Sequence, residues 1–252
     1  MKSAMRWTAL ILGGLVALSV TVSARAAEVS VAVAANFTEP AKEIAAAFQK
    51  TTGNTLALSF GPSGGFYAQI SHGAPFEVFL SADDERPKKL EADGFAVPGT
   101  RFPYAVGRLV LYSRTPGLTD AGEAALKSGR FERLAIADPA AAPYGEAAIE
   151  TMRRLGVYEA IKLKVVQGAS IAQAFQFVST GAAEVGFVAQ SQVVALKGGS
   201  RWLVPERLHA PILQDAVLLK PGAADPAARA FLAFLRSPAA VTIIRRYGYE
   251  VR

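Results

Sequence analysis

The feature that most constrains this sequence is a regular alternation of short apolar runs with amphipathic, helix-like stretches. Residues 28–34 (EVSVAVA) have the apolar character of a buried strand, residues 40–50 show the periodicity of an amphipathic helix, and residues 55–60 form the next apolar run. The same order continues through residues 77–92 and resumes over residues 134–189. This alternation is typical of α/β folds in which helices cover both faces of a mainly parallel sheet.

Two longer apolar runs, residues 104–113 and 210–220, interrupt the pattern. We expect these two runs to form a two-stranded hinge between two lobes, because 252 residues are many for one compact core and sufficient for two. Lobe I then comprises residues 27–105 and 214–252, and lobe II comprises residues 106–213. A ligand is expected in the cleft between the lobes.

The first 26 residues have the features of a secretory signal peptide. A basic start precedes an uncharged, largely apolar run at residues 7–22, and residues 24–26 (ARA) match an A-x-A cleavage site. The apolar run is short for a membrane anchor, which is the alternative. We therefore expect export and a mature chain that begins at Ala27.

Composition excludes several classes of function. The chain has no cysteine, so it has neither disulfides nor a lipid-modified cysteine, and we expect a soluble protein retained in a periplasm. Two histidines without cysteine do not make a His/Cys metal cluster. The basic residues are scattered, and neither G-x-G-x-x-G nor a P-loop occurs, so nucleic acids and nucleotides are not expected as partners.

Four similar junctions carry the strongest indication of function. Each places small or polar residues between an expected strand and the start of an expected helix, at residues 35–37, 61–65, 143–145 and 168–171. A helix start offers unpaired backbone N–H groups and the positive end of the helix dipole, which together attract an anion. Two junctions fall in each expected lobe, so the pattern predicts one small anion held in the cleft.

The side chains at these junctions are neutral: Asn36, Ser63, Tyr144 and Ser170. No lysine or arginine stands among them, so the site offers hydrogen-bond donors rather than a counter-ion. Such a site favours a fully ionised oxyanion, because a proton on the ligand would need an acceptor. Sulfate, molybdate and tungstate meet this condition, and hydrogen phosphate meets it less well.

An enzyme remains an alternative. Residues 61–65 (GPSGG) match the G-x-S-x-G elbow of α/β-hydrolases, with Ser63 as the nucleophile. A base would have to be His72 or His209, and Asp138 followed by His209 is a possible order. No second glycine-rich loop for an oxyanion hole is evident.

Several stretches together resemble the periplasmic molybdate-binding proteins of ABC importers. They are residues 34–37, 61–70, 73–83 (GAPFEVFLSAD), 142–145, 181–189 and 246–249. The resemblance covers almost the whole mature chain. It implies the type II periplasmic-binding-protein fold, with two α/β lobes joined by a two-stranded hinge, no catalytic residues, and no cofactor beyond the bound molybdate or tungstate. It also implies a monomer that delivers its ligand to an inner-membrane ABC permease; a binding protein for sulfate or another oxyanion is the alternative within this class.

Carried over residue by residue, the resemblance implies that Ala35, Asn36 and Ser63 hold the oxyanion from lobe I. Tyr144 and Ile171 would hold it from lobe II, mainly through backbone N–H groups. The chain departs from the family at Ala35, where a serine or threonine is common. A tyrosine that some relatives use near Ala189 is also absent. We therefore expect the Asn36 amide to take over the missing hydroxyl's role.

Overall fold

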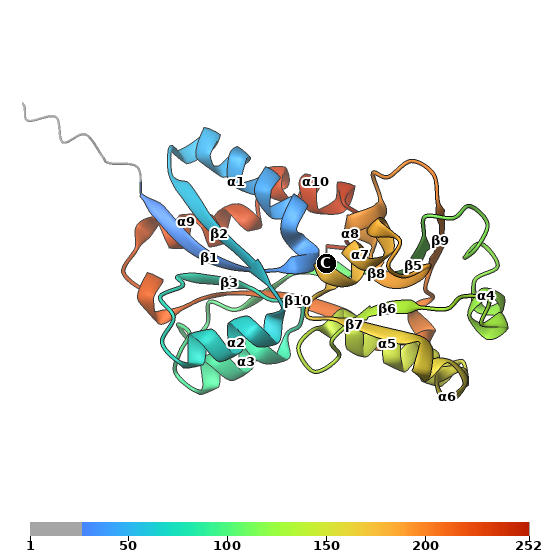
Figure 1. Cartoon of the computed structure of the whole chain (residues 1–252). Coiled ribbons are helices and arrows are strands. Elements are labelled where there is room, and N and C mark those ends of the chain that lie inside the picture. Colours follow the sequence, from blue (N-terminus) through green and yellow to red (C-terminus); the bar gives the residue numbers. More distant parts are fainter. Residues whose placement is uncertain (1–26, 252) are drawn as a thin grey trace, which may run out of the picture.

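The structure, a computed structural model, describes residues 27–251 as two α/β lobes, each built on a five-stranded sheet (Figure 1). The expected signal peptide, residues 1–26, lies outside the described residues. Among residues 27–251, no single helix is long and apolar enough to cross a membrane. The last two helices, α9 (Pro226–Leu235) and α10 (Pro238–Arg246), pass that test only together, with a bend of 57° between them.

The first lobe combines the beginning and the end of the chain. Its strands are β1 (Glu28–Ala34), β2 (Thr55–Gly61), β3 (Val78–Leu80), β4 (Phe102–Gly107) and β10 (Ile212–Leu218). Its helices are α1 (Thr38–Thr52), α2 (Ser63–Ser71), α3 (Glu85–Ala92), α9 (Pro226–Leu235) and α10 (Pro238–Arg246), with short 3-10 turns at Ala35–Phe37 and Lys220–Gly222. The strand order is β2-β1-β3-β10-β4. The first three strands are parallel, and β10 is antiparallel to both of its neighbours.

Helices cover both faces of this sheet, which is why residues 31–34 of its central strand β1 are all apolar. Val31 and Val33 of β1 pack into the core shared with α1, α9 and α10. Ala32, which points to the opposite face, packs with residues of α2 and α3. Alternate residues of a strand face opposite sides, so burial on both sides requires the continuous apolar run VAVA at residues 31–34. Figure 1 shows α1, α9 and α10 on one side of the sheet and α2 and α3 on the other.

The second lobe is formed by the middle of the chain and repeats the same design. Its strands are β5 (Leu109–Ser113), β6 (Leu134–Ala137), β7 (Val165–Gly168), β8 (Val185–Ala189) and β9 (Ser200–Leu203). Its helices are α4 (Glu123–Ser128), α5 (Pro143–Arg154), α6 (Tyr158–Ile161), α7 (Ile171–Thr180) and α8 (Gln190–Val193), with 3-10 turns at Lys162–Lys164 and Glu206–Leu208. The order β7-β6-β8-β5-β9 again has three parallel strands followed by two antiparallel pairings.

The run at residues 104–113, expected as one long strand, is two strands that belong to different sheets. β4 ends at Gly107 and β5 begins at Leu109, so the chain passes between the lobes at Arg108. The second long run, residues 210–220, shortens to β10 and lies entirely in the first sheet. The expected lobe boundaries, after residues 105 and 213, fall inside β4 and β10.

Ion pairs surround the first crossing. The Arg108 guanidinium lies 2.5 Å from Glu250 Oε1 and 3.1 Å from Glu206 Oε1. Glu250 belongs to the C-terminal segment that follows α10, and Glu206 belongs to the 3-10 turn that precedes the return of the chain to the first lobe. The carbonyl of Arg108 also accepts a hydrogen bond from Gln190 N at 3.0 Å. These contacts fix the point at which the two sheets separate.

Candidate anion site between the lobes

Four helix starts meet where the two lobes face each other. In the first lobe, β1 leads into the 3-10 turn at Ala35–Phe37 and β2 leads into α2. In the second lobe, the equivalent strands β6 and β7 lead into α5 and α7. In α/β sheets, ligands bind beyond the carboxyl ends of the strands. The duplicated topology therefore places two such ends from each lobe around one point.

A small cavity lies at this point and contains all five residues expected at the site. Its lining consists of Ala35, Asn36, Ser63, Tyr144 and Ile171, together with Ala34, Gly61, Pro62, Ala82, Ala142 and Pro143. The volume is about 10 Å³, close to the minimum that holds one water molecule. Of the described residues that line it, none is charged. The lobes are therefore closed on a small cavity with an uncharged lining.

Helix starts supply its backbone donors. Ser63 and Ile171 are the first residues of α2 and α7, and Tyr144 is the second residue of α5. The first N–H groups of a helix have no intrahelical acceptor, so these three residues can turn an N–H toward a ligand. The Ser63 hydroxyl oxygen accepts a hydrogen bond from Ala82 N at 2.9 Å. Its proton is left to donate to another acceptor.

Glycines allow the helices of the second lobe to approach the strand ends. A Cβ atom on Gly145 would lie 2.2 Å from the Ala137 carbonyl oxygen, at the end of β6. A Cβ atom on Gly168 would lie 2.8 Å from Ala174 N in α7. Both distances are far below van der Waals contact, so any side chain there would push the helix start away from the cavity.

The structure gives the Asn36 amide a different role from the one expected. Asn36 is 2% exposed, and its Nδ2 donates to Gln214 Oε1 at 2.9 Å and to the Tyr249 hydroxyl at 3.0 Å. An amide nitrogen has two protons, and both are used within the protein. The expectation that this amide replaces a missing hydroxyl toward the ligand is therefore not supported. Asn36 lines the cavity but has only its backbone N–H left to offer.

Gln214 of β10 extends this buried network to the second lobe. Its Oε1 also accepts from the Tyr104 hydroxyl at 3.0 Å, and its Nε2 donates to the Tyr144 hydroxyl at 3.2 Å. Burial raises the pKa of both Tyr104 and Tyr144 well above the ordinary value. Burial also raises the pKa of Tyr249 to about 12, although hydrogen bonds with Ser191 and Asn36 partly oppose it. All three tyrosines are therefore neutral at physiological pH.

Ser191 of α8 joins the lobes on the other side of Asn36. Its hydroxyl donates to the Asn36 carbonyl oxygen at 2.7 Å, and that same oxygen accepts from the Tyr249 hydroxyl at 2.8 Å. The Ser191 and Tyr249 oxygens are 3.0 Å apart. Asn36 is thus fixed by contacts from both lobes.

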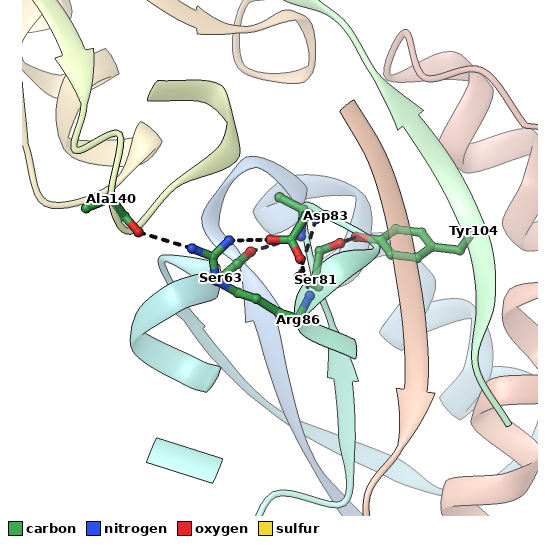
Figure 2. A network of polar contacts seen from close by, with 7 residues as sticks. Ser63, Ser81, Asp83, Arg86, Tyr104 and Ala140 are labelled. Carbon is green, nitrogen blue, oxygen red and sulfur yellow. Dashed lines mark hydrogen bonds and ion pairs between the residues drawn. The ribbon is translucent and has the colours of Figure 1, made fainter. Parts of the chain in front are cut away.

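At the rim of the cavity, two further hydrogen bonds cross between the lobes. Gly64 N donates to the Ala141 carbonyl at 2.9 Å, and Arg86 Nη2 donates to the Ala140 carbonyl at 3.1 Å. Figure 2 shows Arg86 reaching toward Ala140 while Asp83 holds it; Arg86 Nη1 lies 2.6 Å from Asp83 Oδ2. These contacts are possible only when the lobes are closed.

The hydrolase alternative lacks the contacts it requires. His72 Nδ1 lies 2.7 Å from the Ala68 carbonyl, and His209 Nδ1 lies 2.7 Å from the Ala210 carbonyl. Neither histidine is hydrogen-bonded to Ser63, whose hydroxyl is paired with Ala82. Ser170, noted as a polar junction residue, caps its own helix by accepting from Gln173 N at 3.3 Å. Among residues 27–251, no group of His, Asp and Glu side chains is arranged to hold a metal ion.

Sequence reasoning did not identify the residues that position the site. Gln214 and Asp215 are the two polar residues of the otherwise apolar strand ILQDAVL. This break in the apolar pattern was the one available indication that Gln214 has a special role. Nothing in the sequence around Ser191 or Arg86 indicates that either one contacts the opposite lobe.

Two similar α/β lobes, two chain crossings and a central donor-lined cavity define a two-lobed ligand-binding protein. The model of the family described as bacterial extracellular solute-binding protein matches residues 29–250, so the chain belongs to this family.

Individual relatives agree with this assignment. The chain is 59% identical over 232 residues to the molybdate-binding protein ModA of Rhodobacter capsulatus, covering 92% of each chain. It is 56% identical over 233 residues to the molybdate-binding protein ModA of Azotobacter vinelandii, covering 91% of this chain and 92% of the relative. The solved periplasmic molybdate-binding protein of Azotobacter vinelandii superposes with a TM-score of 0.86 at 40% identity, over 89% of this chain and 99% of that one.

Proposed function

We propose that this protein is the periplasmic binding component of an ABC importer and that it captures molybdate, or tungstate, between its lobes. The observation that carries the proposal is the convergence of four neutral helix starts on one cavity that no described charged side chain lines. The names and high identity of the relatives from Rhodobacter and Azotobacter support molybdate as the ligand.

Capture requires movement of the lobes. A tetrahedral oxyanion is larger than a water molecule, and the closed cavity measures about 10 Å³. The lobes must therefore part to admit the anion, with the hinge near Arg108 as the pivot, and the cavity that encloses the anion must be larger than the one in this structure. Ala35, Asn36 and Ser63 would bind from the first lobe, and Tyr144 and Ile171 from the second.

Membership of the solute-binding family supports a transporter permease as the partner. We further propose that the protein acts without a cofactor and without a catalytic step, as a monomer that presents its closed form to this inner-membrane permease. Sulfate is the alternative ligand that an experiment must exclude. A sulfate-binding protein, SubI of Mycobacterium tuberculosis, has the same fold with a TM-score of 0.75, but at 13% identity this likeness concerns the fold alone.

Calorimetric titration of the purified chain with molybdate, tungstate, sulfate and phosphate tests the proposal. We expect tight binding of molybdate and tungstate, and much weaker binding of sulfate and phosphate. In a thermal melt, ligand at 100 times Kd should add about 2.7 kcal/mol to stability. The absence of any molybdate or tungstate binding at millimolar concentration would exclude the function. Covalent labelling of Ser63 by a serine-directed phosphonate would instead favour a hydrolase.

A further inference from the structure

Gln214 is a fully buried polar side chain at the junction of the two lobes. It lies on β10, the strand by which the chain re-enters the first lobe, and its relative exposure is 0%. Buried polar groups are costly unless they are hydrogen-bonded, and a fully satisfied network fixes the positions of its members. The contacts of Gln214 therefore indicate what this residue positions.

These contacts reach one candidate ligand-binding residue in each lobe. Gln214 Oε1 accepts from Asn36 Nδ2 at 2.9 Å, at the helix start that follows β1. Gln214 Nε2 donates to the Tyr144 hydroxyl at 3.2 Å, and Tyr144 belongs to the start of α5. The Tyr104 hydroxyl, on the neighbouring strand β4, lies 3.0 Å from Oε1 and shares its one proton between this oxygen and the Ser81 carbonyl at 3.1 Å. One amide group thus joins the two halves of the cavity.

The direction of each hydrogen bond fixes the orientation of the Gln214 amide. Its oxygen faces two donors, Asn36 and Tyr104, and its nitrogen faces the Tyr144 hydroxyl oxygen. A carboxylate at this position would be a buried charge and could pair with Tyr144 only by accepting its hydroxyl proton, and an apolar side chain would leave the Asn36 amide short of one acceptor. Glutamine matches both requirements.

We propose that Gln214 is a positioning residue for oxyanion capture: by tying Asn36 to Tyr144 it sets the separation of the two half-sites and thereby the size of anion that the closed cleft accepts. The proposal rests on the proposed function, because the half-sites matter only if they share one anion. Gln214 itself does not line the cavity. Its effect on binding is therefore transmitted through the two residues that it holds.

The test is a double-mutant cycle read out by titration with molybdate and with sulfate. Gln214→Met retains the volume and removes the amide, and Tyr144→Phe removes the hydroxyl while keeping the backbone N–H. We expect Gln214→Met to raise Kd for molybdate about tenfold and Tyr144→Phe to raise it severalfold, which corresponds to the loss of one or two buried hydrogen bonds. The double variant should bind no more weakly than Gln214→Met, because both changes break the same link.

Specificity supplies a readout that a purely structural role would not change. If Gln214 sets the half-site separation, the ratio of molybdate affinity to sulfate affinity should fall in Gln214→Met. The matched control is Val217→Ala, on the same strand. Val217 is fully buried but packs with the α2 and α3 face of the sheet, away from the cavity. This control should lower the melting temperature and leave Kd and the ratio within about twofold of the parent chain.

The outcomes distinguish the proposed function from the positioning role of Gln214. If the parent chain does not bind molybdate, the proposed function fails. If the parent binds and Gln214→Met retains both its Kd and its selectivity, or if the two substitutions add independently, the positioning role is wrong. Should Gln214→Met fail to fold, Tyr144→Phe carries the test alone, and an unchanged molybdate Kd in that variant overturns the proposal.

Discussion

A Cβ atom on Gly107 would lie 2.2 Å from the hydroxyl oxygen of Tyr144, closer than any non-bonded contact allows. The same atom would lie 2.6 Å from Gln214 Nε2. Gly107 is the last residue of β4, just before the chain passes into the second lobe. The absence of a side chain there lets the Tyr144 hydroxyl meet Gln214, so closure of the lobes depends on a glycine at the hinge.

We expect Gly107→Ala to destabilise the closed protein and to weaken molybdate binding. Overpacking of a buried site usually costs about 1–3 kcal/mol, and here the added methyl group displaces two hydrogen-bonded side chains. Urea denaturation, with and without molybdate, measures both effects. A variant with unchanged stability and Kd would show that the hinge accommodates the methyl group, contrary to the contacts described.

Ser63→Ala should affect ligand binding and folding stability together. Loss of a hydrogen bond to an anion costs about 1.5–3 kcal/mol of binding free energy, and loss of an acceptor for the buried Ala82 N–H costs about 1–3 kcal/mol of stability. Ser71→Ala is the matched control on the same helix, because the buried Ser71 hydroxyl has no hydrogen-bond partner among the described residues. Titration and thermal melts of both variants make the comparison. Equal molybdate affinity in Ser63→Ala and the parent would remove Ser63 from the site.

Arg86→Ala should accelerate release of the ligand. Arg86 donates to the Ala140 carbonyl across the closed cleft, so its contribution appears only after closure. Because the side chain is 25% exposed, solvent screening reduces the effect to about 1 kcal/mol, or a fewfold increase in the dissociation rate. Stopped-flow measurements should show a nearly unchanged association rate. Lys89→Ala on the same helix is the control, and an equal change in that variant would indicate a general effect of surface charge.

Asp215, next to Gln214, should make a contribution to folding stability that decreases as pH rises. Burial raises the pKa of this carboxyl above its ordinary value, although the ion pair with Arg101 opposes the shift. A carboxyl whose pKa is higher in the folded state than in the unfolded state stabilises the protein at low pH. That contribution is lost as pH rises from about 4 through the folded-state pKa.

Asp215→Asn removes this titration and should therefore gain stability relative to the parent as pH rises above about 4. Urea denaturation of both chains between pH 4 and 7 gives the difference in free energy of unfolding. A difference that moves the other way would mean that the Arg101 ion pair outweighs the cost of burial.

Features of this fold that depend on neighbouring residues could be predicted from the sequence, whereas features that depend on distant residues could not. The first strand is found at residues 28–34 as expected, because burial on both faces makes most of it apolar. The last two helices begin at Pro226 and Pro238, and both starts are local features, because a capping Asp225 or Ser237 precedes each proline. The break at Arg108 was missed, since the residues on both sides are apolar and the division depends on which sheet each strand joins.

The candidate site also combines features that are local in sequence with features that depend on long-range contacts. Strand-to-helix junctions are local features, so the sequence indicated the four junctions. The family resemblance then implied five residues at these junctions, and the fold brings them together around the cavity. The direction of the Asn36 amide could not be predicted, because its partners Gln214 and Tyr249 lie 178 and 213 residues away. Contacts of that range are determined by the closed arrangement of the lobes rather than by any local pattern.

The last prediction concerns Ala35, where many relatives are expected to carry a hydroxyl. Ala35 lines the cavity and is 6% exposed, and the neighbouring Asn36 amide is already paired within the protein. No side chain at this junction is therefore available to donate to the anion. Ala35→Ser should supply that donor and tighten molybdate binding, with an upper limit of about 1.5–3 kcal/mol for a hydrogen bond to a charged group.

Ala35→Cys is the matched control, since a thiol occupies similar space but donates only weakly. Asn36→Ala provides the contrast: it removes two buried hydrogen bonds and should lower stability while raising Kd through lost positioning. Titration of the three variants with molybdate distinguishes these effects. One combination of results would contradict this account: Ala35→Ser leaves Kd unchanged, while Asn36→Ala raises Kd without lowering stability. Such results would mean that the Asn36 amide does contact the anion. The amide would then have to leave Gln214 and Tyr249 when the ligand binds.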